Sequence, residues 1–281
     1  MLLHILEHTF IDTLKILPFL FLAYLIIELI EKKAGDKTTN IIKKSGKFGP
    51  VLGGLLGIFP QCGFSAAASN LYAGRVITMG TLIAIFLSTS DEMLPILISE
   101  AVAPSIIIKI LAIKLLIAII VGVLVDLIFK QKESNSKEDI HKLCHEQHCH
   151  CEEEGILKST IKHTIQILIY IFIVTLILNI VIELIGEETI ANLILNIPVL
   201  GPIISALIGL IPNCASSVIL TQLYLENIIS MGSIIAGLLV NSGIGILILF
   251  RVNKDQKENF KILGILYTVG IISGIILDLI M

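Results

Sequence analysis

The chain has 281 residues, of which 55% are hydrophobic and only 15% are charged, with a formal net charge of −3 and a mean hydropathy of +0.95. A water-soluble domain carries about 25% charged residues. The composition therefore excludes a soluble enzyme, a nucleic-acid-binding protein and a secreted disulfide scaffold. It indicates an all-α protein that crosses a membrane several times.

Six apolar segments have the length of membrane-spanning helices, which is about twenty residues for a hydrocarbon layer of roughly 30 Å. In chain order they are Thr9–Ile30, Val76–Ser99, Ile106–Phe129, Thr164–Ile185, Ile228–Phe250 and Lys261–Ile280. Two more apolar segments, Phe48–Tyr72 and Leu200–Tyr224, each contain a proline near the middle. Because proline ends a helix, each arm has only about twelve residues, or roughly 18 Å, and is too short to cross. We predict a helical hairpin in both places, with its tip near the bilayer midplane.

The chain contains an internal duplication. The first hairpin segment aligns without a gap on the second at an offset of 152 residues, and the same offset relates the last helix of each half. Matched pairs include Gly49/Gly201, Pro60/Pro212, Cys62/Cys214 and Asp126/Asp278. We predict two transmembrane repeats, residues 1–130 and 163–281, joined by a cytoplasmic loop of residues 131–162. Each repeat would hold three spanning helices and one broken hairpin, which makes ten helical segments in all.

The placement of Lys and Arg predicts that the two repeats are inverted. A hairpin that enters and leaves on one side gives three crossings per repeat, so the second repeat has the opposite orientation. This topology gathers the basic segments on the cytoplasmic side, as the positive-inside rule requires. These segments are the loop 31–47, Arg75, the loop 130–162 and Arg251–Lys261. We expect a multi-pass protein of the cytoplasmic (inner) membrane with both termini outside. If Phe48–Tyr72 were one full span, the lysine-bearing loop 130–162 would face outward.

The two predicted hairpin tips carry matching polar groups. Irregular backbone at mid-membrane depth survives only where it is buried in protein or lines a cavity. We therefore expect the tips to face each other and to bind substrate through an amide, a thiol and a hydroxyl from each. These residues are Gln61, Cys62 and Ser65 in the first tip and Asn213, Cys214 and Ser217 in the second. The alternative is that the thiols and hydroxyls only pack between helices.

Ser90, Asp91 and Glu92 form the second candidate site. A charge at mid-membrane costs about 2.5–3.5 kcal/mol on insertion scales, so two adjacent carboxylates indicate a cation ligand or a proton carrier. The second repeat supplies a neutral polar surface in the same place, through Asn241 and Ser242. The alternative is a shorter helix that leaves both acids at its external end. Lys114 also lies deep in a predicted span, and the sequence identifies no partner for it.

By contrast, Asp126 and Asp278 fall near the ends of their predicted helices. We expect them to be interfacial or paired for structure.

The predicted cytoplasmic loop carries a dense cluster of metal-ligating side chains. They are His141, Cys144, His145, His148, Cys149, His150 and Cys151. Imidazole and thiolate suit zinc, copper and nickel, and the acids that follow add oxygen ligands for manganese. Their irregular spacing predicts a flexible scavenging or sensing segment, with no tightly bound cofactor. A solvated linker without a metal role is the alternative.

On these residues, the chain resembles the ten-transmembrane heavy-metal exporters, also described as arsenic-efflux-like permeases or manganese transporters. The most specific motifs are Phe59-Pro60-Gln61-Cys62-Gly63-Phe64-Ser65, Ser90-Asp91-Glu92 and Ile211-Pro212-Asn213-Cys214. The resemblance covers nearly the whole chain and implies export of a metal or metalloid.

The residues leave the transported ion open. Asp91 and Glu92 favour a hard divalent cation such as Mn²⁺, whereas Cys62 and Cys214 favour a soft ion or arsenite. Helix N-termini at the tips favour an oxyanion. We expect a Mn²⁺ exporter that works by proton antiport. Its expected partners are the ion and the lipid bilayer, with no nucleic acid, and a homodimer is one possible oligomeric state. A metalloid permease, a channel and a metal sensor remain alternatives. A membrane metalloenzyme is disfavoured because His145-Glu146-Gln147-His148 is one residue short of His-Glu-x-x-His.

Overall fold

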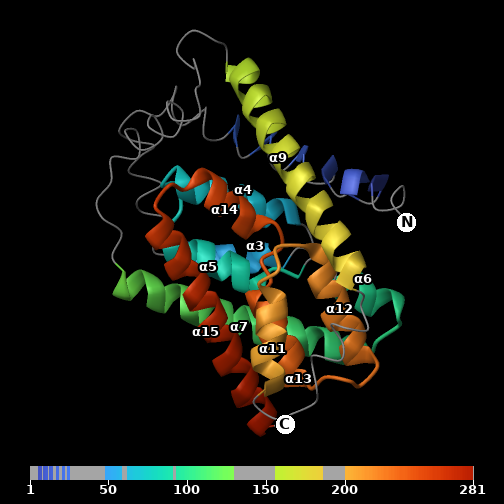
Figure 1. Cartoon of the computed structure of the whole chain (residues 1–281). Helices are drawn as coiled ribbons and strands as arrows, with labels where there is room; N and C mark the ends of the chain where they lie inside the picture. The colour runs from blue at the N-terminus through green and yellow to red at the C-terminus, as the bar shows by residue number, and fades with distance from the viewer. Residues whose placement is uncertain are drawn as a thin grey trace.

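The computed structural model describes residues 48–58, 62–90, 93–129, 156–185 and 200–280, together with scattered helical positions between Leu6 and Leu25. These residues form helices and short connections, with no strand among them (Figure 1). In the first repeat the helices are α3 (Gly49–Gly57), α4 (Cys62–Ala73), α5 (Met79–Ser88), α6 (Met93–Ser99) and α7 (Pro104–Ile128). In the second they are α9 (Ile156–Ile185), α11 (Leu200–Gly209), α12 (Cys214–Leu225), α13 (Met231–Val240), α14 (Gly245–Val252) and α15 (Gln256–Ile280).

Both predicted breaks in the hairpin segments are confirmed. The first segment divides into α3 and α4, of nine and twelve residues, and the second into α11 and α12, of ten and twelve residues. Pro212 lies in the connection between α11 and α12, where its missing N–H removes no helical hydrogen bond. Pro60 lies outside the described residues.

The prediction that Val76–Ser99 and Ile228–Phe250 are continuous helices is wrong. The first is interrupted between α5 and α6, and the second between α13 and α14. Hydroxyl and amide side chains bond to nearby backbone at these points and so compete with the helix. The Thr89 hydroxyl donates to the Ile85 carbonyl at 2.7 Å, and the Asn241 amide oxygen accepts from the Gly243 N–H at 2.8 Å. Two of the expected spans are therefore each divided into two helices.

The long helices lie at the periphery and the broken ones at the centre. α7 and α15 are each 25 residues long and apolar, and only 22% of their most apolar stretch is buried. The interrupted stretch Met231–Val252 is 89% buried. Counting each broken pair as one, five described stretches are long and apolar enough to cross a membrane. α9 begins at Ile156, ahead of the predicted repeat boundary at residue 163.

The two halves pack in the same way and exchange one arm. α3, α5 and α7 pack together in the first repeat, as do α11, α13 and α15 in the second. The second arm of each hairpin contacts the short helix of the other repeat, α4 on α14 and α12 on α6. In Figure 1 α4 lies beside α14, and α12 lies beside α6. The arm exchange brings both hairpins to the two breaks of the central helices.

A repeated set of hydrogen bonds fixes the start of each central helix. The Asp126 carboxylate accepts from the Gly80 N–H at 2.8 Å and from the Thr78 hydroxyl at 2.7 Å. The equivalent Asp278 accepts from Gly232 at 2.8 Å and from Ser230 at 2.9 Å. Each carboxylate therefore satisfies free N–H groups at a helix N-terminus and ties the central helix to a long outer one. The structural role expected for both acids is confirmed.

Candidate functional site

Within each repeat, the end of the first hairpin arm lies against the end of the central helix. α3 ends at Gly57, where a Cβ atom would overlap the Ser88 hydroxyl and the Ile85 carbonyl. α11 ends at Gly209, where a Cβ atom would overlap the backbone of Gly237. The two glycines permit this close approach because they carry no side chain. The ends of α3 and α11 are therefore neighbours of the points where α5 and α13 end.

The break in the second repeat also adjoins the first hairpin. The Ser69 hydroxyl of α4 lies 2.7 Å from the carbonyl oxygen of Gly245, the first residue of α14. A Cβ atom on Gly245 would lie 2.8 Å from the Cβ of Ser65 and 2.8 Å from the Phe86 ring. Ser65 is fully buried. The predicted tip residue Ser65 therefore lies at the contact between the two repeats.

The side chain of Asn213 has structural partners on two helices. Its side-chain oxygen accepts from the Ala215 N–H at 3.5 Å and so caps α12. Its amide nitrogen donates to Asn179 of α9 at 2.5 Å, and Asn179 donates in turn to the Thr9 hydroxyl at 2.9 Å. This chain of hydrogen bonds ties the second tip to α9 and to the N-terminal helical residues. Sequence analysis missed Asn179, although an amide inside an apolar helix is a signal for such a partner.

The break between α13 and α14 presents polar groups that nothing in the described chain satisfies. Asn241 and Ser242 are 3% and 2% exposed. The amide nitrogen of Asn241 and the hydroxyl of Ser242 lack a hydrogen-bond partner among the described residues. Gly243 follows with φ 54°, a backbone conformation that glycine adopts without strain. Because unpaired buried polar groups are costly, these two atoms are the best candidates for contact with a ligand.

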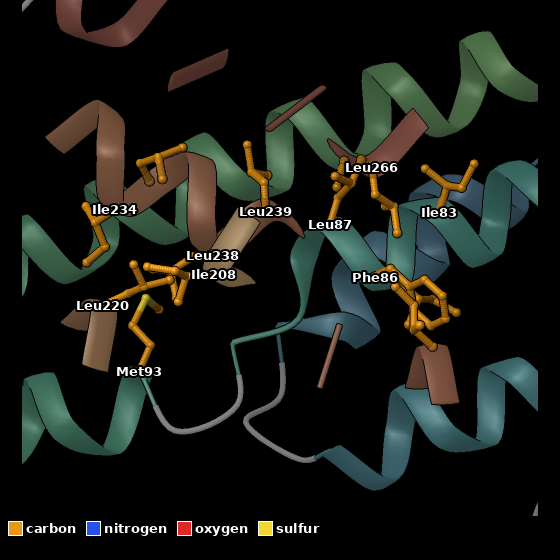
Figure 2. Close-up of a cluster of buried hydrophobic side chains, with 14 of the residues drawn as sticks. Ile83, Phe86, Leu87, Met93, Ile208, Leu220, Ile234, Leu238, Leu239 and Leu266 are labelled. Carbon is orange, nitrogen blue, oxygen red and sulfur yellow. The ribbon is translucent and has the colours of Figure 1, made fainter. Parts of the chain in front are cut away.

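The break in the first repeat is closed by its own hydroxyl groups. Ser88, Thr89 and Ser90 are all buried, and each hydroxyl donates to a nearby carbonyl, that of Ile85 for the first two and that of Ser88 for Ser90. After the break, α6 begins at Met93, whose side chain lies beside Leu220 in the hydrophobic core (Figure 2). The described part of this break therefore offers no unsatisfied hydroxyl to a ligand.

Lys114 is the one charged side chain that the structure describes as fully buried, with 1% exposure. It projects from α7, and its ammonium group donates to the carbonyl oxygens of Thr89 and Leu238, the latter at 3.0 Å. Thr89 follows the last residue of α5, and Leu238 lies in the last turn of α13. One lysine thus joins the ends of both central helices. A lysine near the middle of a 25-residue apolar helix is the sequence signal for it.

The structure describes only part of the predicted site. Six predicted side chains are buried at the tips and breaks, namely Ser65, Ser90, Asn213, Ser217, Asn241 and Ser242. Cys62 and Cys214 are the first residues of α4 and α12, and only their backbone is described. Gln61, Asp91, Glu92 and the loop residues 141–151 lie outside the described residues. In the part of the chain that is described, no three His, Cys, Asp or Glu side chains gather closely enough to hold a metal ion.

Central helices that break where buried polar groups gather are typical of multi-pass membrane transporters. The sequence matches the family described as "Putative, 10TM heavy-metal exporter" over residues 1–197 and 164–281, and the chain belongs to this family. The predicted resemblance is confirmed, and the chain is a multi-pass membrane transporter of metal ions. An exporter family agrees with the expectation that the chain is not an enzyme. No curated protein and no solved structure matches the chain.

Proposed function

We propose that this protein is a secondary transporter that exports a divalent metal ion, with Mn²⁺ favoured, across the cytoplasmic membrane. The observation that carries the proposal is the packing of α4 on α14 and of α12 on α6, next to helix breaks that hold buried polar side chains. Broken helices free backbone carbonyls and N–H groups at a depth where no water competes for them. In this proposal the ion binds between the tips, near Asn241, Ser242 and Ser65.

Two contacts on one side of the molecule support an inverted arrangement of the repeats. The Arg75 guanidinium, just after α4, forms two bonds of 3.1 and 3.0 Å with the Glu258 carboxylate near the start of α15. The ammonium group of Lys261 lies 3.3 Å from the centre of the Phe129 ring, at the end of α7. If Leu200–Tyr224 crossed as one span, each of these pairs would be divided between opposite faces of the membrane. Both contacts therefore favour a hairpin at Leu200–Tyr224, and the duplication extends this to Phe48–Tyr72, with residues 1–130 and 163–281 as inverted repeats.

The choice of ion rests on the residues next to the breaks. Asp91 and Glu92 lie in the sequence between α5 and α6, and two carboxylates suit a hard divalent cation. Asn241 and Ser242 would then bind water molecules that the ion retains, because an amide N–H donates to oxygen and cannot ligate a cation. Alternate binding of the ion and a proton at Asp91 or Glu92 would give proton antiport. The His/Cys loop 141–151 would capture zinc, copper, nickel or manganese ions on the cytoplasmic side.

Flux into liposomes tests the proposal. Purified protein in liposomes is expected to carry Mn²⁺ in preference to Zn²⁺ and Co²⁺, and to lose this flux in Asp91→Asn and Glu92→Gln while remaining folded. Cys62→Ser is the matched variant at the tip and is expected to keep most of the Mn²⁺ flux. Full Mn²⁺ flux in both carboxylate variants would remove the proposed site.

The second candidate function is a permease for arsenite or another oxygen-bearing metalloid. The free N–H of Asn241 and the free hydroxyl of Ser242 favour it, because both donate to oxygen atoms. Arsenite flux that fails in Cys62→Ser and Cys214→Ser, with no Mn²⁺ flux, would establish this function instead. A flux unaffected by a pH gradient would indicate a channel or a uniporter rather than an antiporter.

Site-directed labelling tests the topology. Single cysteines at Lys132, Asn227 and Lys257, in a background without the five native cysteines, are treated with a membrane-impermeant maleimide. The inverted arrangement predicts that Lys132→Cys and Lys257→Cys react from the cytoplasmic face and Asn227→Cys from the outer face. If Leu200–Tyr224 spans the membrane once, Lys132→Cys and Asn227→Cys react from the same face, and if Phe48–Tyr72 spans once, Lys132→Cys reacts from the outer face.

A further inference from the structure

The ends of the two central helices form a cation-binding position. The last carbonyls of a helix have no partner within the helix, and the C-terminal end of the helix dipole is negative. Thr89 and Leu238 contribute such carbonyls from α5 and α13, one from each repeat. In transporters with broken helices, carbonyls of this kind coordinate inorganic cations. Here both carbonyls accept from the Lys114 ammonium group.

We propose that the Lys114 ammonium is a tethered monovalent cation, which permanently fills a carbonyl site between the two repeats that Na⁺, K⁺ or a small alkylammonium ion would otherwise occupy. An ammonium group has three donors and no acceptor, so it matches a cluster of carbonyl oxygens. The four-carbon stem of the lysine reaches the site from α7, which packs against both central helices.

The site belongs to one repeat only. The residue equivalent to Lys114 is Leu266, on α15, which is fully buried in the hydrophobic core beside Leu87 (Figure 2). A charge at this depth is costly, and packing alone is satisfied by leucine at the matching position. The cation therefore has a role that the packing shared by the two repeats does not require.

The site has a consequence for transport, which rests on the proposed function. Asp91 and Glu92 follow Thr89 by two and three residues. A fixed positive charge near this break would partly neutralise the carboxylates when no metal is bound, so wild-type flux needs no inorganic monovalent co-ion. We expect Mn²⁺ uptake by the wild type to be the same in Na⁺, K⁺ and choline buffers.

Replacement of the tether by a free cation tests the inference. In Lys114→Ala the stem is removed, and the melting temperature in detergent is expected to fall by several degrees in choline buffer. Methylammonium or Na⁺ should restore part of this loss by binding the folded state at the vacated carbonyls, with no effect on the wild type. Because the chain has no Trp, unfolding is followed by size-exclusion chromatography after heating.

Two further variants serve as controls. Lys114→Met keeps the length of the stem but lacks the charge, so it leaves no room for methylammonium, and its flux should fall about tenfold without rescue. Lys109→Ala removes an exposed lysine five residues earlier on the same helix and should show no cation dependence.

Two results would overturn the inference. The first is equal melting of Lys114→Ala in choline, Na⁺ and methylammonium. The second is wild-type stability and flux in Lys114→Met, which decides the matter if the alanine variant does not fold. The melting assay contains no transition metal. A wild type without metal flux would therefore refute the proposed function while leaving the rescue experiment to decide the cation site.

Discussion

The internal duplication is preserved in the contacts of the outer helices α7 and α15 with the central helices, which we call the frame, but not at the centre of the molecule. In the frame, Asp126 and Asp278 make the same hydrogen bonds to the start of the central helix in each half. At the centre, Lys114 is matched by Leu266, and its ammonium serves the helix ends of both halves. Duplication explains the frame, whereas the proposed ion site lies at the centre. The residues that break the symmetry are therefore the ones to test for function.

The largest effect is expected where helices touch through glycine. A Cβ on Gly80 would overlap the Gly122 backbone and the Asp126 carboxylate, and a Cβ on Gly232 would overlap the matching atoms of the second repeat. Gly80→Val and Gly232→Val should each cost about 3 kcal/mol or more and abolish folded protein, since overpacking forces the backbones apart. Yield of monodisperse protein measures this.

Gly264→Val is the control for these two variants, because no atom lies within 4 Å of a Cβ built at that position of α15. It should be recovered in normal yield. If Gly80→Val is also recovered with wild-type melting, the close packing of the frame is not needed for folding.

Asp126→Ala and Asp278→Ala should have the next largest effect. Each removes a carboxylate that accepts from a backbone N–H and a hydroxyl at a helix start. We expect each to lower the free energy of unfolding by about 1–3 kcal/mol. Equal losses in thermal melts would support a symmetric frame. A loss confined to one of the two variants would show that the copies have diverged at the frame as well.

The sequence predicted the parts of the fold that depend on proline and on the repeat. Pro212 marked a real break, and the offset of 152 residues paired Asp126 with Asp278 as the structure does. The breaks at Thr89 and at Asn241–Gly243 were missed, because hydropathy counts serine, threonine and asparagine only as mildly polar. Their competition for backbone hydrogen bonds, and the positive φ of Gly243, are local chemistry that an average over twenty residues conceals.

Part of the candidate site was predictable because the two repeats agree. Ser65, Ser217 and Asn213 were identified because both tips have the same pattern, and all are buried. Lys114 was noted as a lysine that could pair with an acid, but its bonds to the carbonyls of Thr89 and Leu238 were not predicted, since backbone acceptors on two distant helices leave no mark in the sequence. Long-range partners of this kind follow from the packing of α7 on α5 and α13.

The smallest effect is expected at the ion pair between Arg75 and Glu258. Burial acts to lower the pKa of the Arg75 guanidinium, but the hydrogen bond and the charge of Glu258 outweigh it and raise the pKa, so the guanidinium stays charged. Both side chains are about a quarter exposed, at 25% and 21%. Their coupling energy, from Arg75→Gln, Glu258→Gln and the double variant, should be about 0.5–1 kcal/mol and should decrease with salt.

This pair is another place where the two halves differ, because the equivalent residues are Asn227 and Ile106, which cannot form an ion pair. If the pair closes one face of the transporter, its loss should raise the flux of ions from that face more than it lowers stability. Lys257→Gln removes a neighbouring exposed charge and is the matched control. A coupling energy of zero, with unchanged flux in both directions, would leave the asymmetry of the molecule at its buried centre alone.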